Sequence, residues 1–158
     1  MEKKQGKIIS VNISDKKGVS KRPVPGAVLI KDFGMEGDAH SGSVRQVSLM
    51  GWEDVEIWKN KKAKSIEIKP GDFAENITTA GIDWSNVKIG DEIIIGGKIK
   101  LKITRIGKEC HSNCKIKDLV GDCIMPKKGI FANVVEGGKI QQGDSIELLP
   151  CTTAGEEN

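Results

Sequence analysis

Short apolar segments separated by glycine constrain the fold of this chain more than any other feature. Nineteen glycines are spread over 158 residues, and the segments between them are brief and rich in isoleucine and valine. Ile99, Leu101 and Ile103 alternate with polar residues, which predicts a strand with one buried face. Gly96-Gly97 precedes this strand and is a two-residue hairpin signal. By the same criteria we predict strands at 8–13, 27–30, 46–50, 92–95, 99–104, 130–135 and 145–149.

Helical patterns are few. Trp52, Val55 and Trp58 recur every three residues between residues 51 and 62, with acidic residues early and lysines late, as the helix dipole favours. A second short helix is predicted at 116–120. Many short strands and few helices indicate a mainly β protein, either a compact β-barrel or a sandwich.

Glycines also predict where the chain turns. Gly137-Gly138 is expected to turn strand 130–135 back onto strand 145–149. Gly90-Asp91 and Gly143-Asp144 each precede an apolar strand, and we interpret both as ordinary turns.

Length and composition bound the organisation and the partners. We expect one domain over residues 1–149 and a flexible tail over 150–158. The chain shows no signal-peptide pattern and no apolar run of about 20 residues, so we expect a cytoplasmic protein with no membrane segment. A net charge of +3, three tryptophans, three phenylalanines and no tyrosine do not favour nucleic-acid binding. A small anionic ligand suits this charge better.

Residues 34–40, with Arg45 shortly after them, form the first loop that could hold a ligand. Two glycines free the backbone to present amide groups to an anion, and Arg45 could clamp a phosphate. The alternative is a tight connection in which Asp38 caps its own backbone and Arg45 lies on a solvated strand face.

Residues 71–81 form a second candidate loop, which we expect to be too polar for the core. Asn76, Thr78 and Thr79 supply neutral donors and acceptors that suit a heterocycle edge or a phosphate. Turn chemistry with side-chain-to-backbone bonds explains the same residues equally well.

Three of the four cysteines and one of the two histidines lie within fourteen positions, as Cys110, His111, Cys114 and Cys123. These four side chains could complete a tetrahedral zinc site, although three of them fall within five residues rather than in two separated pairs. Alternatively, Cys110 is a reactive thiol, because cationic residues on both sides favour the thiolate. A third alternative is that Cys114 and Cys123 are small buried apolar residues.

Several motifs occur together in an order that resembles the MOSC domain, the C-terminal module of molybdenum cofactor sulfurase. The resemblance runs from about residue 6 to residue 149 and is strongest to short stand-alone bacterial members. The motifs are Lys-Lys-Gly-Val-Ser-Lys-Arg-Pro at 16–23, Gly-Met-Glu-Gly-Asp-Ala-His at 34–40, Arg-Gln-Val-Ser-Leu at 45–49, Gly-Asp-Phe-Ala-Glu-Asn-Ile-Thr at 71–78, Ile-Gly-Asp at 89–91, Gly-Lys-Glu-Cys-His at 107–111 and Gly-Asp at 143–144.

The resemblance implies a mainly β fold, a compact β-barrel with a few short helices. It also implies a functional cysteine at Cys110, where this chain has Glu-Cys and the family commonly has Pro-Cys. Cys110 would ligate molybdenum or hold a persulfide, independently of pyridoxal phosphate. The implied residues that bind the molybdenum cofactor (molybdopterin) are His40, Arg45, Asn76, Thr78 and His111.

Three functions follow as hypotheses. The first is a carrier that takes molybdenum cofactor, or sulfur from a sulfur donor, and passes it to client molybdoenzymes. The second is a molybdenum-dependent reductase of N-hydroxylated compounds, which would need a separate electron donor. The third is a structural zinc module built on the cysteine cluster.

Overall fold

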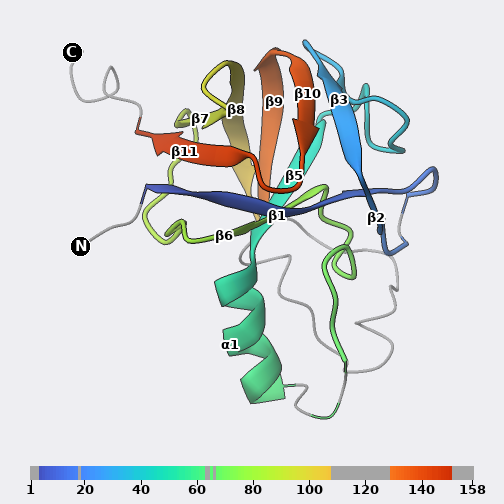
Figure 1. Cartoon of the computed structure of the whole chain (residues 1–158), viewed down its shortest axis with the longest axis vertical. Helices are drawn as coiled ribbons and strands as arrows, with labels where there is room; N and C mark the ends of the chain where they lie inside the picture. The colour runs from blue at the N-terminus through green and yellow to red at the C-terminus, as the bar shows by residue number, and fades with distance from the viewer. Residues whose placement is uncertain (1–3, 18, 63–64, 66, 108–128, 151–158) are drawn as a thin grey trace.

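The computed structural model describes residues 4–17, 19–62, 65, 67–107 and 129–150. Strands dominate these ranges, and α1 is the only helix within them (Figure 1). The elements are β1 (Gln5–Ile13), β2 (Arg22–Val24), β3 (Gly26–Ile30), β4 (Gly34–Met35), β5 (Val47–Gly51), α1 (Trp52–Lys62), β6 (Ile77–Ala80), β7 (Glu92–Ile95), β8 (Ile99–Ile106), β9 (Ile130–Glu136), β10 (Gly138–Gln141) and β11 (Ser145–Leu149).

Seven strands close into a barrel, which confirms the mainly β prediction and selects a barrel over a sandwich. The strand order is β11-β7-β8-β9-β5-β6-β1, and pairing of β1 with β11 closes the ring. Neighbours in the ring are antiparallel except β5 and β6, which run parallel. A parallel pair needs a long crossover, and α1 lies in the connection between these two strands. Figure 1 shows α1 projecting from one end of the barrel.

The β7–β8 hairpin forms at the glycines that predict it, but its connection has three residues, Gly96, Gly97 and Lys98, rather than two. Ile95 pairs with Ile99, and Gly96 and Gly97 between them have φ angles of 62° and 78°. The Lys98 amide donates to the Ile95 carbonyl oxygen at 3.2 Å, and positive φ at both central residues of this β-turn gives a twist that matches that of the strands. The odd-numbered apolar residues of β8 point into the barrel, so that Leu101 has no exposed surface.

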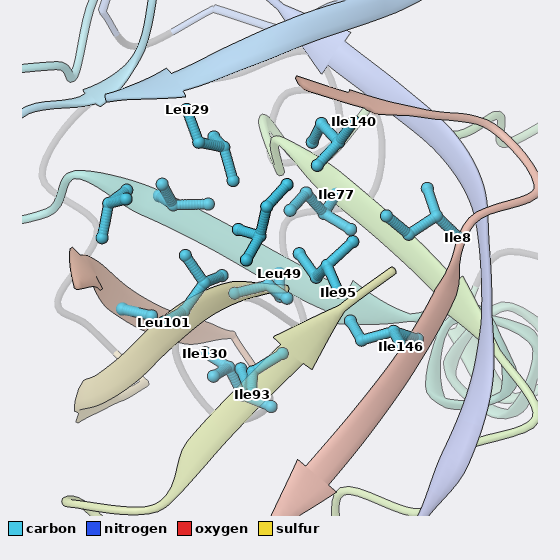
Figure 2. Close-up of a cluster of buried hydrophobic side chains, with 14 of the residues drawn as sticks. Ile8, Leu29, Leu49, Ile77, Ile93, Ile95, Leu101, Ile130, Ile140 and Ile146 are labelled. Atoms are coloured by element: carbon cyan, nitrogen blue, oxygen red, sulfur yellow. The ribbon is translucent and has the colours of Figure 1, made fainter. Parts of the chain in front are cut away.

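The barrel interior is filled by aliphatic side chains from all seven strands (Figure 2). Ile8, Leu49, Ile77, Ile93 and Ile146 come from five different strands and are at most 1% exposed. Full burial of one such side chain contributes roughly 1.5–3 kcal/mol, so the core is the main source of stability. β-Branched residues fill it because they fit a pleated, buried surface.

The predicted turn at Gly137-Gly138 is wrong. These glycines connect β9 to β10, a strand that we did not predict, whereas β11 pairs with β7 and β1. β10 pairs with β3 in a smaller sheet of order β10-β3-β4. A Cβ on Gly137 would collide with the carbonyl oxygen of Leu29, so this glycine permits a close passage of two backbones rather than a hairpin.

Helix α1 is confirmed within one residue of its predicted start. Val55 and Trp58 lie on its buried face, and the ring of Trp58 packs edge-on against Phe73 with centroids 5.2 Å apart. The second predicted helix, at 116–120, lies outside the described residues. Within the described ranges, no helix combines the length and apolar character that a bilayer crossing requires.

Candidate functional site

Buried polar side chains gather where β1, β5 and β6 meet. We call the set the polar network; it comprises Ser10, Asn12, Ser14, Lys21, Asp38, Ser48, Glu75, Asn76 and Thr78. Glu75, Asn76 and Thr78 have no exposed surface, so the expectation that residues 71–81 are too polar for the interior is wrong. Their polar atoms can be buried because most of them bond to one another and to the backbone.

Asn76 joins three strands at the start of β6. Its Oδ1 accepts hydrogen bonds from the backbone N of Ser48 at 3.0 Å and from the Ser48 hydroxyl at 3.2 Å. Its Nδ2 donates to the carbonyl oxygen of Asn12 at 3.2 Å, and the Asn12 amide donates back to the carbonyl oxygen of Asn76 at 2.7 Å. The amide of Asn76 is therefore committed to protein groups and fixes where this loop enters the barrel.

Thr78 lies in a chain of hydrogen bonds that ends on Glu75. The hydroxyl of Ser10 donates to Asn12 Oδ1 at 2.6 Å, and Asn12 Nδ2 donates to Thr78 Oγ1 at 3.0 Å. Thr78 Oγ1 then donates to Glu75 Oε2 at 2.7 Å. Every donor points toward the same carboxyl, and such aligned chains strengthen one another in a low-dielectric interior.

Asp38 organises the loop that carries His40. One carboxylate oxygen accepts bonds from Lys21 Nζ at 2.8 Å and from the Ser14 amide at 3.1 Å, and the other accepts the His40 amide at 3.0 Å. Burial by itself raises the pKa of Asp38, but the Lys21 ammonium and the two amides outweigh it and hold the pKa below its usual value. Asp38 thus caps its own backbone, as the alternative interpretation of this loop predicted, and it also neutralises a buried lysine.

Arg45 follows His40 in a turn held by Ser43. The Ser43 hydroxyl donates to the His40 carbonyl oxygen at 2.6 Å and accepts the Arg45 amide at 3.0 Å. The Nε of Arg45 is buried and has no hydrogen-bond partner among the described residues. An unmet donor on a charged group is costly, so this atom suits an anionic ligand.

Gly71 connects the His40 side of the network to the Asn76 side. The amide of Gly71 donates to Glu75 Oε2 at 2.9 Å, and its carbonyl oxygen accepts the Lys21 amide at 2.8 Å. Gly71 has a φ of 93°, and a Cβ there would collide with the carbonyl oxygen of Lys21. Glycine is therefore required where the two loops touch.

Cys110, His111, Cys114 and Cys123 lie outside the described residues, but the ends of their segment are placed. The Gly107 amide donates to the carbonyl oxygen of Gly129 at 2.7 Å. Next to them, Ile106 pairs with Ile130, which pairs with Leu49, and Leu49 pairs with Ile77. Ile106 and Ile130 therefore flank the cysteine segment and belong to one row of paired residues across the barrel. That row ends at Ile77, the neighbour of Asn76.

Sequence reasoning missed Asn12, Lys21 and Glu75. Asn12 lies inside a strand, where alternation indicates only that it faces away from the core. Lys21 stands among other cations and resembles a solvated residue, yet its side chain is 1% exposed. Glu75 gave one signal, a carboxylate between Phe73 and Ile77, both apolar and both buried.

Neither a pocket nor a metal-ligand cluster elsewhere in the described residues offers a second candidate site. An open hollow of about 490 Å³ includes Asp83 and Asp91 in its lining but none of the predicted site residues. Both carboxylates accept bonds from the backbone of their own turns. Within the described ranges, no three potential metal-ligating side chains lie close enough together to hold a metal ion. The zinc hypothesis concerns residues outside these ranges and stays a prediction.

The sequence profile of the MOSC domain matches residues 36–147. The chain belongs to the MOSC domain family. The matched range contains His40, Arg45, Asn76, Thr78 and Cys110. Among individual proteins, the uncharacterized protein YflK of Bacillus subtilis (strain 168) is 26% identical over 142 residues. That alignment spans 84% of this chain and 63% of YflK, so this MOSC chain matches less than two thirds of its relative.

Solved structures share the fold of this MOSC domain. The YuaD protein from Bacillus subtilis superposes with a TM-score of 0.73 at 19% identity, over 93% of this chain and 97% of YuaD. YiiM from Geobacillus stearothermophilus superposes with a TM-score of 0.70 at 20% identity, over 91% of this chain and 75% of YiiM. YiiM from Escherichia coli gives a TM-score of 0.67 at 21% identity, over 92% of this chain and 70% of its own length. At these identities the likeness establishes the barrel alone.

Proposed function

We propose that this MOSC domain is a carrier that binds molybdenum cofactor, or holds sulfur as a persulfide on Cys110, and delivers it to a client molybdoenzyme in the cytoplasm. The observation that carries the proposal is the buried Nε of Arg45, which has no partner among the described residues. Family membership supplies the class of ligand, because MOSC domains are associated with proteins of molybdenum cofactor metabolism.

Arg45 fits the phosphate of molybdopterin. A guanidinium presents several N–H groups in a plane and binds phosphate with two parallel hydrogen bonds. The turn from His40 to Arg45 is fixed by Ser43, so the guanidinium starts from a preorganised backbone. His40 begins the same turn, and we assign it to the same end of the ligand.

Asn76 and Thr78 would contribute a fixed wall for the pterin. Their side-chain polar atoms bond to protein groups, so they hold the backbone of the loop in place. A rigid wall lowers the entropy that a ligand loses on binding. This positioning role replaces direct recognition of the pterin edge by their side chains.

The chain length between Ile106 and Cys110 would allow the Cys110 thiol to reach this wall. Neighbouring strands lie about 4.8 Å apart, so three steps separate Ile106 from Ile77 by about 14 Å. Four residues, the separation of Ile106 from Cys110, span at most about 14 Å. His111 would lie next to the thiol and favour its thiolate form.

Two kinds of chemistry suit a thiolate at this point. Bound cofactor supplies a molybdenum centre, for which Cys110 would be a soft sulfur ligand. Without cofactor, the Cys110 thiolate attacks the terminal sulfur of a persulfide donor. The new S–S bond leaves a persulfide on Cys110, and the donor departs as a thiolate, so no external oxidant is needed.

Native mass spectrometry of protein purified anaerobically from cells that make molybdenum cofactor tests the proposal. Wild type should carry the mass of the pterin cofactor or of one sulfur atom, and Cys110→Ala should lose it. Cys151→Ala is the matched control, because it removes a cysteine of the C-terminal tail, and it should keep the added mass.

Three other outcomes would contradict the carrier proposal. If wild type has only the mass of the bare protein, it carries neither the cofactor nor a persulfide. A zinc-sized increment, lost on substitution of Cys110, His111, Cys114 or Cys123, would establish the zinc module instead. Reduction of an N-hydroxylated compound by cofactor-loaded protein with a supplied electron donor, abolished in Cys110→Ala, would establish the reductase.

A further inference from the structure

Glu75 is sealed inside the protein with only one of its carboxyl oxygens engaged. Its side chain has no exposed surface. Oε2 accepts bonds from the Gly71 amide at 2.9 Å and from the Thr78 hydroxyl at 2.7 Å. Oε1 is also buried and has no hydrogen-bond partner among the described residues. The proposed function gives this carboxyl no contact with ligand, so its presence needs another explanation.

The described surroundings of Glu75 offer no counter-charge. The charged groups of the adjoining segments include Lys21, Asp38, Arg45, Lys69 and Asp72, and none of the hydrogen bonds described for the Glu75 carboxyl comes from a cation. The Lys21 ammonium is bound to Asp38 at 2.8 Å. The groups that favour a carboxylate here are all neutral: the Gly71 amide and the Thr78 hydroxyl, which bond to Oε2, and the backbone of Phe73 and of Glu75 itself. Burial raises the pKa of Glu75, and its hydrogen bonds offset this only in part. An isolated carboxylate is far more costly to bury than a carboxylic acid.

The network gives this carboxyl a geometric role. Ser10 donates to Asn12, Asn12 donates to Thr78, and Thr78 donates to Glu75 Oε2. The Gly71 amide donates to the same oxygen. The Glu75 carboxyl thus accepts directly from β6 and from the loop that precedes β6, and β1 is linked to it through the hydroxyl of Thr78. The residue after Glu75 is Asn76, and Gly71 contacts the loop that carries Lys21.

We propose that Glu75 is a positioning residue that works as a neutral carboxylic acid and locks the Gly71–Thr78 segment between the two halves of the site. The proposal rests on the proposed function, because the segment that Glu75 locks includes the wall assigned to the pterin. A proton on Oε1 removes the buried charge and leaves Oε2 free to accept both donors. Ionisation would place a charge in the sealed network and loosen it.

Glu75→Gln is the discriminating variant. A glutamine amide is neutral, its oxygen can accept from Gly71 and Thr78, and its NH2 group takes the place of the protonated Oε1. Glu75→Ala removes the acceptor at every pH. Glu67→Gln is the matched control, because Glu67 is an exposed glutamate in the same connection.

The sign of the pH dependence follows from linkage. An acid whose pKa is raised on folding stabilises the folded state fully below its unfolded pKa, about 4.3 for glutamate, and loses that stability as pH rises toward its folded pKa. Glu75→Gln does not lose stability in this way, because glutamine does not ionise. The ratio of folding equilibrium constants, Glu75→Gln over wild type, should therefore rise about tenfold per pH unit within that window.

Urea unfolding of ligand-free protein at a series of pH values from 5 to 9 measures this ratio. In parallel, NMR at pH 7 should place the Gly71 amide and the Asn76 side-chain amide of Glu75→Gln at their wild-type positions. Glu67→Gln should show a flat ratio. Glu75→Ala should shift both resonances and lose bound pterin if wild type carries it.

A ratio for Glu75→Gln that is flat or falls with pH would overturn the proposal, because it would mean that Glu75 is ionised in the folded protein. A large shift of the Gly71 amide in Glu75→Gln at pH 7 would do the same. Both measurements use ligand-free protein. If wild type fails to retain pterin, the proposed cofactor binding is contradicted, but the result for Glu75 still holds.

Discussion

At the residue scale, most polar groups of the candidate site form hydrogen bonds with other protein groups, which leaves few of them to bind a ligand. The residue chemistry of Asn76 suits either a heterocycle edge or side-chain-to-backbone bonds, and the structure shows both ends of its amide bonded to β1 and β5. A single sequence shows which polar groups exist and does not show which of them find partners inside the protein. Arg45 is the opposite case, since its Nε has no described partner.

The Lys21–Asp38 ion pair carries a prediction at this scale. Asp38→Asn would leave a buried ammonium without its counter-charge and should cost about 3–5 kcal/mol of unfolding free energy. The double variant Lys21→Met with Asp38→Asn should recover most of that loss, because neither charge is then buried. Urea denaturation of the three proteins at pH 7 measures both effects.

The pair also predicts a pH dependence. The pKa of Asp38 is lowered in the folded state, so its contribution is present above the unfolded pKa, about 3.9, and is lost as pH falls through the folded value. Wild type should therefore lose more stability than the double variant between pH 5 and pH 2. Equal acid sensitivity of the two proteins would contradict the assigned role of Asp38.

At the element scale, the sequence was informative where structure is local. Alternation placed β7, β8 and their glycine turn, because a hairpin is specified by neighbouring residues. Strand β10 was missed because Gly-Lys-Ile-Gln at 138–141 has one buried apolar residue and depends on pairing with β3, more than a hundred residues away. The parallel pairing of β5 with β6 is equally nonlocal.

Gly71 and Gly97 are examples of two kinds of glycine turn, one in contact with another loop and one in open space. Both have positive φ, but a Cβ on Gly71 would collide with the Lys21 backbone, whereas nothing lies within 4 Å of one on Gly97. Gly97→Ala should cost about 1 kcal/mol from backbone strain alone. Gly71→Ala should cost at least about 2–3 kcal/mol, because the loop must also move. Equal melting temperatures for the two variants would show that the loops are not locked together at Gly71.

At the scale of the whole molecule, the barrel is a scaffold that brings distant loops to one place. Ser14 bonds to the loop at 38–45, and Lys21 bonds to the loop at 71–78. The cysteine segment begins and ends beside the row of paired residues that runs from Ile106 to Ile77. The order of motifs predicted the family, and the profile match confirms it. The motifs could not show that a buried ion pair and a buried acid hold these loops together, because burial arises from packing across the barrel.

Arg45 is expected to bind the phosphate of the cofactor. Pterin released from anaerobically purified protein can be oxidised and measured by its fluorescence for wild type, Arg45→Gln and the exposed charge control Lys139→Gln. Hydrogen bonds to a charged group contribute about 1.5–3 kcal/mol, so retained pterin in Arg45→Gln should fall by about tenfold to a hundredfold. Lys139→Gln should match wild type. Equal retention in all three proteins would contradict the placement of the cofactor phosphate at Arg45.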